Sequence, residues 1–359
     1  MNDKYYMKKC FDLALKAKGR VLRNPLVGAV LIKDGKIISE GYHHGYGMIH
    51  AEIDCFNNLK EDPKGASLYV NLEPCSHYGK QGPCTKEIIK RGIKKVVISN
   101  LDTNPKVSGI KELLDNGIDV VTGILEDEGL KLNEKFFFNI KYNRPLIALK
   151  YAQTLDGKIS SNTGDSKWIS NKFSREYVHK LRNDYDAIIV GKETILKDNP
   201  SLNSRIDGGI DPVRVILDSN LSIEKKIKDF KIFDLESDKK TFIATCKYST
   251  NKNLNIIRCE SKNNRIDLND LVNKLYAMNL GSILVEGGST INYSFLKENL
   301  VDRIYEFISP IIIAGDRSKS AFSGRGVDNI KYGYKFEIED IKRFDTDIMI
   351  GAKNVYWNI

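Results

Sequence analysis

Three residues that can bind one metal ion constrain the fold of this 359-residue chain more than any other feature of its sequence. They are His50, in the run His50-Ala51-Glu52, and two cysteines that each follow a proline, Cys75 and Cys84. An imidazole and two thiolates suit zinc, and three protein ligands leave a fourth coordination position for water. The chain must therefore fold so that separate segments meet at one point.

Glu52 gives this predicted zinc site a chemical role. Zinc lowers the pKa of its bound water towards neutrality, and Glu52, which is not needed as a ligand, can carry a proton from that water to a leaving amine. The pattern H-x-E followed by P-C-x-x-C is the signature of zinc-dependent nucleobase deaminases. This chain departs from the pattern, because eight residues rather than two separate Cys75 from Cys84.

Two other interpretations of these residues stay open. His77 could be a fourth ligand, and four protein ligands are typical of a structural zinc site. Glu52 would then have no role. Separately, Glu52 could be merely a solvated helix residue. Four of the five histidines lie within the first 77 residues and close to both Pro-Cys pairs, which favours a metal site over isolated capping or buried histidines.

Residues 1–143 show alternating strand and helix patterns, which predict an α/β domain with helices on the faces of a sheet. A two-residue turn at Asp34-Gly35 predicts a hairpin. The expected helices cover residues 4–18, 50–59, 85–91, a short segment near 111, and 126–142; the expected strands cover 27–32, 36–40, 67–72, 95–99 and 119–121. Pro145 discourages further helix, so we place the domain boundary at Asn143-Arg144.

Residues 144–359 repeat the alternation and predict a second α/β domain. The expected strands cover 146–151, 187–190, 213–217, 241–244 and 282–285, with two late strands around 303–313 and 347–356, and a helix covers about 173–183. The run from Val285 to Thr290 follows a strand, contains Gly287-Gly288 and opens a helix, where backbone N–H groups can approach a phosphate. It is not G-x-G-x-x-G, so by itself it is only a weak indication.

Composition limits the remaining possibilities. The chain is 41% hydrophobic and 29% charged, as in ordinary globular proteins. We expect no membrane span, since no run of about 18 apolar residues exists. The N-terminus lacks the blocks of a signal peptide, so we expect a cytoplasmic protein with reduced thiols. The net charge of +9 could indicate an anionic partner, but the lysines are spread along the chain, and we expect no nucleic-acid partner.

The motifs resemble one family closely. The runs Asn24–Val30, Gly41–His43, His50–Glu52 and Leu72–His77 resemble those of bacterial riboflavin-biosynthesis deaminase-reductases. The second half resembles the reductase half of that family, with these runs in the same order: Thr154–Lys158, Ser166–Ser170, Leu181-Arg182, Gly191–Thr194, Asp198–Pro200, Leu217–Ser219 and Glu286–Gly288. The family has a long segment between its cysteines, which accounts for the departure noted above.

The resemblance implies a fold and two activities. It implies a cytidine-deaminase-like three-layer α/β/α domain (1–143) and a dihydrofolate-reductase-like α/β domain (144–359). The first would use Zn²⁺ to deaminate the pyrimidine of a ribosylamino phosphate, and the second would use NADPH to reduce its ribose to ribityl. We also expect a homo-oligomer, because domains of these kinds commonly associate. The longer inter-cysteine segment would then suit a small phosphorylated substrate rather than a flipped base.

The resemblance also implies roles for individual residues. The zinc ligands would be His50, Cys75 and Cys84, and Glu52 would be the proton carrier. The cofactor-binding residues would be Ala152, Trp168, Thr194, Asp198, Ser219, Gly288, Ser289, Thr290 and Ile291. The substrate-binding residues would be Asn24, His43, His77 and Lys80 in the first half, and Ser166, Arg182, Leu202, Arg205 and Glu286 in the second. Arg182 and Arg205 suit bidentate phosphate binding.

Three questions stay open at this point. A nucleic-acid cytidine or adenosine deaminase with an accessory nucleotide-binding domain is the alternative function, and a structural zinc module fused to a nucleotide-binding regulator is a non-enzymatic one. The general acid of the reductase is not evident, although Asp198 or a water chain could serve. Finally, Ile110 directly follows Ser108-Gly109, where the family usually has another basic residue and a glycine, and this shortening casts doubt on contacts of that loop.

Overall fold

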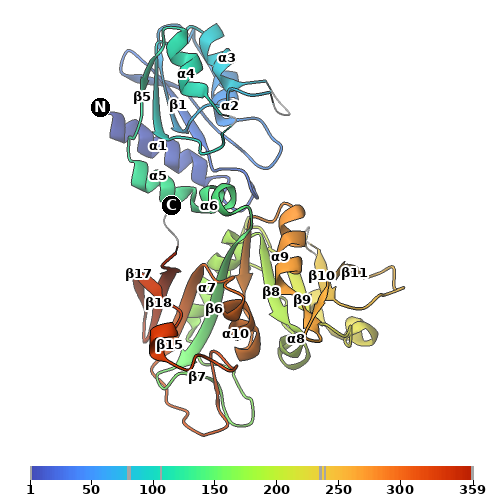
Figure 1. Cartoon of the computed structure of the whole chain (residues 1–359). Helices are drawn as coiled ribbons and strands as arrows, with labels where there is room; N and C mark the ends of the chain where they lie inside the picture. Colours follow the sequence, from blue (N-terminus) through green and yellow to red (C-terminus); the bar gives the residue numbers. More distant parts are fainter. Residues whose placement is uncertain (1, 79–81, 106, 234–236, 238–239, 357–359) are drawn as a thin grey trace. The chain divides into compact units, whose positions relative to one another are not determined.

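The computed structural model describes residues 2–78, 82–105, 107–233, 237 and 240–356. The chain divides into two compact units on either side of the Asn143–Arg144 bond (Figure 1), and each is described by itself. Among the described residues, no helix is both long enough and apolar enough to cross a membrane.

The first unit contains a five-stranded sheet with the order β2-β1-β3-β4-β5. Its strands are β1 (Gly28–Lys33), β2 (Lys36–Tyr42), β3 (Ser67–Leu72), β4 (Lys95–Asn100) and β5 (Asp119–Val121). Its helices are α1 (Asp3–Leu15), α2 (Ala51–Asn57), α3 (Cys84–Lys90), α4 (Gly109–Asp115), α5 (Glu126–Leu132) and α6 (Glu134–Tyr142). Strand β1 is antiparallel to β2 and β3, whereas β3, β4 and β5 are parallel.

Alternate residues of β1 pack on opposite faces of this sheet, as a strand's period of two requires. Ala29 and Leu31 belong to the hydrophobic cluster that includes Phe56 of α2. Val30 belongs to the cluster that includes Met7 of α1. Helices therefore cover both faces of the sheet, and the predicted three-layer α/β/α arrangement is confirmed.

Two local expectations for this unit need correction. The single helix expected over 126–142 is two helices that meet at Asn133, whose buried side chain accepts a hydrogen bond from the Leu26 N–H (2.7 Å) and donates one to the Leu26 carbonyl (3.0 Å). Asparagine amides compete in this way with regular helix formation. His50, expected inside the first turn of its helix, is instead the N-cap of α2. The turn at Asp34-Gly35 is confirmed, with φ of +49° and +76°.

The second unit contains a nine-stranded sheet with the order β11-β10-β9-β8-β14-β6-β15-β18-β17. Its strands are β6 (Leu146–Thr154), β8 (Ala187–Gly191), β9 (Val213–Leu217), β10 (Thr241–Thr245), β11 (Asn255–Arg258), β14 (Ser282–Val285), β15 (Arg303–Ser309), β17 (Phe336–Phe344) and β18 (Asp347–Asn354). The strands from β11 to β15 are parallel, and β18 and β17 complete the sheet in antiparallel fashion.

Further elements of this unit surround the large sheet. Two small antiparallel pairs join β7 (Lys158–Ser160) to β16 (Lys319–Ser320) and β12 (Ser261–Lys262) to β13 (Arg265–Ile266). The helices are α7 (Lys172–Asp184), α8 (Lys192–Asp198), α9 (Leu268–Ala277) and α10 (Ser289–Lys297), with short 3₁₀ turns η1 (Glu224–Asp229), η2 (Lys231–Phe233) and η3 (Ile330–Tyr332). Sequence reasoning did not identify α9, β17 or the β12–β13 hairpin.

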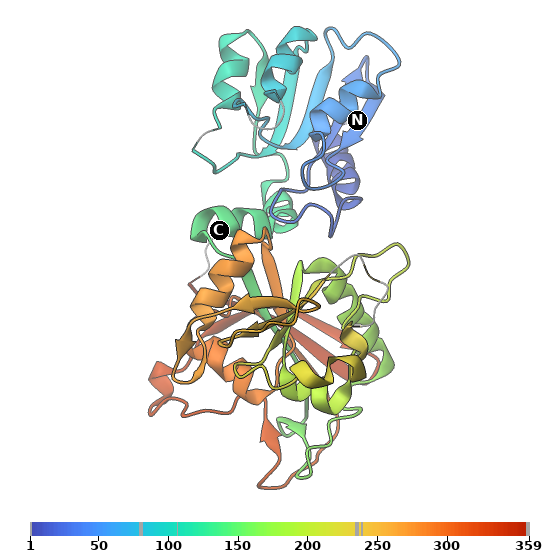
Figure 2. The ribbon, with the colours of Figure 1, turned by 90° about the vertical axis from the view of Figure 1, so that its right-hand side faces the viewer.

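Both faces of the large sheet are covered by helices (Figure 2). Ala187 and Ile189 of β8 face the hydrophobic cluster that includes α9 and Phe295 of α10. Ile188 and Val190 face the cluster that includes Ile195 of α8. Because β8 is buried on both faces, it is a continuous apolar run, as is typical of parallel sheets. The two-unit α/β architecture is the one predicted.

Candidate active sites

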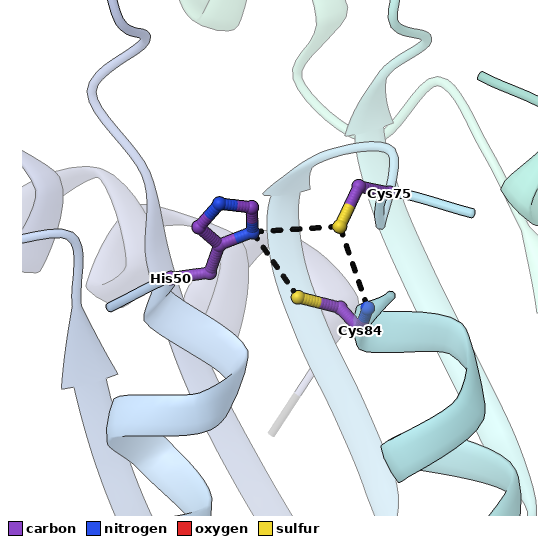
Figure 3. A group of neighbouring side chains, drawn as sticks. All are labelled: His50, Cys75 and Cys84. Atoms are coloured by element: carbon purple, nitrogen blue, oxygen red, sulfur yellow. Dashed lines mark hydrogen bonds between the residues drawn. The ribbon is translucent and has the colours of Figure 1, made fainter. Parts of the chain in front are cut away.

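The three predicted metal ligands converge in the first unit, as Figure 3 shows. The Nδ1 atom of His50 lies 3.3 Å from the Sγ atom of Cys84 and 3.4 Å from the Sγ atom of Cys75. The three ligand atoms all lie within 4.8 Å of one another. In the part of the chain that the structure describes, this is the one such group of histidine, cysteine or acidic side chains.

These spacings fit one tetrahedral zinc ion. With Zn–S bonds of about 2.3 Å and Zn–N bonds of about 2.0 Å, a tetrahedral site places sulfur and nitrogen ligands about 3.5 Å apart. The two N–S distances of 3.3 and 3.4 Å are close to that value. The donor set, one imidazole and two thiols, is also one that zinc prefers.

The fold places each ligand at the end of a secondary-structure element. His50 caps α2, Cys75 follows β3, and Cys84 is the first residue of α3. The backbone N–H of Cys84 donates a hydrogen bond to the Cys75 sulfur at 3.3 Å. A donor of this kind stabilises a thiolate, so the polypeptide favours the ionised ligand at this position.

Cys75 and Cys84 shift the pKa of each other in opposite directions. The Cys84 thiol, with smaller contributions from His50 and the Cys84 N–H, lowers the pKa of Cys75 to about 4. The pKa of Cys84 is raised by its bond to Cys75 and by burial. Both cysteines must be ionised to bind zinc, and the low pKa of Cys75 favours the ionised form at neutral pH.

Glu52 lies beside this group and is only 4% exposed. Burial raises the pKa of its carboxyl to about 7, although the neighbouring His50 lowers it. A carboxyl with a pKa near neutrality can both accept and return a proton at neutral pH. The alternative that Glu52 is a solvated helix residue is therefore wrong.

Two of the predicted substrate residues lie together next to the ligands. Asn24 Nδ2 lies 3.2 Å from His43 Nε2, and the His43 ring lies 6.1 Å from the His50 ring, edge to face. His43 is buried, with its Nδ1 atom 2.9 Å from the Ile49 carbonyl oxygen. Asp54 of α2 accepts a hydrogen bond from the Tyr42 N–H and so ties the end of β2 to α2.

The other two predicted substrate residues of the first unit are not in this group. His77 is exposed and does not belong to the metal-ligand group, which counts against its being a fourth ligand. Lys80 lies outside the described residues.

Sequence reasoning missed the residues that hold the loop before α4 against the ligand turn. Glu73 accepts hydrogen bonds from the N–H groups of Ile110 (3.1 Å) and Asp102 (3.3 Å). The Ser108 N–H donates to Ser76 Oγ at 2.8 Å. A Cβ at Gly109 would lie 2.1 Å from the Pro74 carbonyl oxygen, so only glycine fits there. The shortened loop therefore packs directly on the Pro74-Cys75 turn, a contact between segments more than 30 residues apart in the sequence.

The second unit contains a cavity of about 440 Å³ at the carboxyl ends of its parallel strands. Eight of the predicted residues line it: Ser166, Thr194, Asp198, Ser219, Gly288, Ser289, Thr290 and Ile291. The cavity extends from Leu217 at the end of β9 and the nearby Ser219, past Gly191 at the end of β8 and Gly288 after β14, to Ser160 of β7. Ligands of open α/β sheets bind at this edge.

Three charged residues form a buried group beside this cavity. Arg182 donates from Nε to one Glu286 oxygen (2.7 Å) and from Nη2 to the other (3.0 Å), and Lys150 Nζ lies 3.9 Å from Glu286. Burial by itself raises the pKa of Glu286, but Arg182 and Lys150 outweigh it and lower the pKa to about 2. The fork of Arg182 that we expected to bind phosphate is thus occupied by Glu286, and our expectation needs correction: Arg182 orients Glu286.

The remaining predicted residues lie away from the cavity lining. Trp168 is 70% exposed and stacks on the guanidinium of Arg175 at 4.6 Å. Leu202 is buried in the core with a left-handed φ of +57°, and Arg205 is exposed with a φ of +52°. Ala152 is half-buried in β6, opposite Phe307 of β15. Sequence reasoning also missed Lys150, although a lysine within an apolar strand was a usable signal.

Comparisons with known proteins decide the family. Residues 1–100 match the cytidine and deoxycytidylate deaminase zinc-binding region, and residues 145–350 match the RibD C-terminal domain. The riboflavin biosynthesis protein RibD of Actinobacillus pleuropneumoniae is 39% identical, over 98% of this chain and 95% of that protein. RibD of Aquifex aeolicus is 40% identical, over 98% of both. The chain belongs to the RibD family.

Solved structures agree with this assignment. A deaminase-reductase of Thermotoga maritima has 38% identity and a TM-score of 0.88, with 98% of both chains covered. RibD of Acinetobacter baumannii has 30% identity and a TM-score of 0.86, over 98% of this chain and 99% of that one. As a RibD protein, the chain is a bifunctional deaminase and reductase of riboflavin biosynthesis, with zinc and NADPH as its cofactors. The predicted function is confirmed, and the nucleic-acid deaminase alternative is wrong.

Proposed function

We propose that residues 1–143 deaminate 2,5-diamino-6-(5-phosphoribosylamino)pyrimidin-4-one and that residues 144–359 then reduce the ribosyl group of the product to ribityl. The Thermotoga maritima relative is named as a diaminohydroxyphosphoribosylaminopyrimidine deaminase and 5-amino-6-(5-phosphoribosylamino)uracil reductase. The observation that carries the proposal is the convergence of His50, Cys75 and Cys84 beside a buried Glu52.

In the deaminase half, His50, Cys75 and Cys84 would hold zinc, which supplies a water acidic enough to lose a proton near neutral pH. Glu52 accepts that proton and delivers it to the leaving amine. The carboxyl is suited to both steps because burial raises its pKa to about 7.

The substrate would contact the polar residues around this centre. Asn24 and His43, which lie 3.2 Å apart, are suited to hydrogen-bond the pyrimidine. Their positions are fixed by contacts behind them, since His43 is held by the Ile49 carbonyl oxygen. His77 and Lys80 follow the Pro74-Cys75 turn in the sequence, and we propose that they bind the phosphorylated sugar of the substrate.

In the reductase half, NADPH supplies a hydride, and the protein positions it against the sugar carbonyl carbon. The cavity lined by Thr194, Asp198, Ser219 and residues 288–291 would hold the cofactor. Ala152 and Trp168, which lie outside this lining, stay predicted cofactor contacts. Gly288 precedes α10, so backbone N–H groups face the cavity where a pyrophosphate is favoured. Ser166, Leu202, Arg205, Arg182 and Glu286 would form the substrate side.

The experiment that tests this function follows ammonia release and NADPH oxidation with the diaminopyrimidine substrate and zinc present. We expect both signals in equal amounts. Absence of both would refute the proposal. The cytoplasmic location, the homo-oligomeric state and the absence of a nucleic-acid partner stay predictions.

A further inference from the structure

We propose that Arg265 binds the 2′-phosphate of NADPH and is the residue by which the reductase half selects NADPH over NADH. The two cofactors differ only in this phosphate, so a selecting residue must lie at the adenosine end of the site. The inference rests on the proposed placement of NADPH in the 440 Å³ cavity of the second unit.

The order of strands in the sheet gives the cavity a direction. Ser160 of β7 lies at the end of the cavity that follows β6, and Glu286 with Arg182 lies after the neighbouring β14. The nicotinamide must face that end, because the proposed substrate residues are there. The adenosine must then lie two strands away, beyond β8 and over the end of β9.

The end of the cavity at β9 is suited to an adenine ring with an anion beside it. Leu217, Ile266 and Leu268 provide an apolar wall. Ser219 Oγ accepts a hydrogen bond from the Ile266 N–H at 3.2 Å, which fixes the β12–β13 hairpin to the end of β9. The Ser219 hydroxyl can still donate to an oxygen.

Arg265 lies between this cavity and a second, basic one. Arg265, Ile266 and Leu268 line both cavities, and the second also contains Lys262 and Lys297. Arg265 is exposed, and within the described ranges its guanidinium has no hydrogen-bond or ion-pair partner. A free guanidinium fork matches a phosphate dianion better than any other side chain.

The hairpin itself indicates an anionic ligand. Lys262 and Arg265 are directly opposite in the β12–β13 pair, and directly opposed like charges destabilise a pair of strands. The turn between them, Asn263-Asn264, has φ of +52° and +59°, which holds the two strands in tight register. Lys262 is compensated by Glu298 at 2.9 Å. A phosphate dianion bound to Arg265 would offset the repulsion between the Arg265 and Lys262 charges.

Another cation near this end, Lys192, is the main competitor. Its Nζ atom lies 2.9 Å from Ser222 Oγ and 3.8 Å from an Asp218 carboxylate oxygen. An acidic neighbour already compensates this ammonium group, which disfavours it as the ligand of the 2′-phosphate.

The test compares 2′,5′-ADP with 5′-AMP, which differ only in the 2′-phosphate, by calorimetric titration of the full chain. We expect Arg265→Gln to weaken 2′,5′-ADP binding about 10- to 100-fold, the range for loss of charge-assisted hydrogen bonds, and to change 5′-AMP binding less than about threefold. NADPH should lose affinity in the same proportion, while NADH should not. Retained 5′-AMP binding also reports that the variant is folded.

Arg258→Gln is the matched control, since it removes the same charge from β11 but lines neither cavity. It should leave the ratio of the two affinities unchanged. The inference would be overturned if Arg265→Gln weakened the binding of both nucleotides equally. It would also be overturned if the preference for 2′,5′-ADP over 5′-AMP survived in Arg265→Gln and was lost in Lys192→Gln. Neither result would count against the proposed cofactor site. A native chain that binds neither NADPH nor 2′,5′-ADP would overturn the proposed cofactor site as well.

Discussion

The buried group of Arg182, Lys150 and Glu286 makes the stability of the reductase half depend on pH. The side chains of Arg182 and Glu286 are only 14% and 12% exposed, and two hydrogen bonds join them. Arg182 and Lys150 lower the pKa of Glu286 from its ordinary value of 4.5 to about 2, although burial acts in the opposite direction. The substitution Glu286→Gln removes the charge on which this dependence rests.

The size of the effect follows from this difference in pKa. A change from 4.5 to about 2 corresponds to about 3 kcal/mol of folding free energy. The pKa is lower in the folded state, so this stabilisation is complete above pH 4.5, where Glu286 is ionised in both states. It is lost as the pH falls towards 2, and about 1.5 kcal/mol remains at pH 3.

Urea unfolding followed by tryptophan fluorescence measures this effect in the correct half, because both tryptophans, Trp168 and Trp357, follow Arg144. We expect Glu286→Gln to lower the free energy of unfolding by about 3 kcal/mol at pH 7 and by about half as much at pH 3. Glu176→Gln, which breaks an exposed pair with Lys172, is the control and should have little effect. A loss that is the same at both pH values would show that ionisation of Glu286 does not stabilise the fold.

Three further predictions concern the two halves separately. Glu52→Ala should lower the deamination rate about 100-fold or more and leave reduction of the deaminated product unchanged; equal loss of both activities would indicate misfolding. Cys84→Ser should remove zinc, measured by metal analysis, without loss of NADPH binding, whereas full zinc content would contradict its role as a ligand. A fragment that starts at Arg144 should bind NADPH without zinc, and a folded fragment that does not bind it would count against independent domains.

The deaminase centre could be predicted well because each of its metal ligands belongs to a short motif that is recognisable in the sequence. His50, Cys75 and Cys84 each lie at the end of a helix or strand that the sequence pattern predicted. A regular α/β sheet brings the ends of these elements together. The break of the helix at Asn133 was not predicted, because it depends on hydrogen bonds to Leu26, which is far away in sequence.

The reductase site was predicted less completely for a related reason. Residues on regular elements or next to glycine turns, such as Thr194 and Gly288, line the cavity as expected. The role of Arg182 could not be foreseen, since its partner Glu286 is 104 residues away and a sequence does not show which guanidinium is already paired. The β12–β13 hairpin has two-residue strands, which are too short to give a recognisable alternation.

Whether two separate sites act in sequence can be tested on the full chain after a chelator has removed its zinc. We expect this protein to release no ammonia from the diaminopyrimidine substrate and to oxidise no NADPH with it. It should still oxidise NADPH when given 5-amino-6-(5-phosphoribosylamino)uracil, and added zinc should restore ammonia release. Loss of both reactions on zinc removal, or NADPH oxidation with the undeaminated substrate, would show that the two halves do not act as separate, consecutive sites.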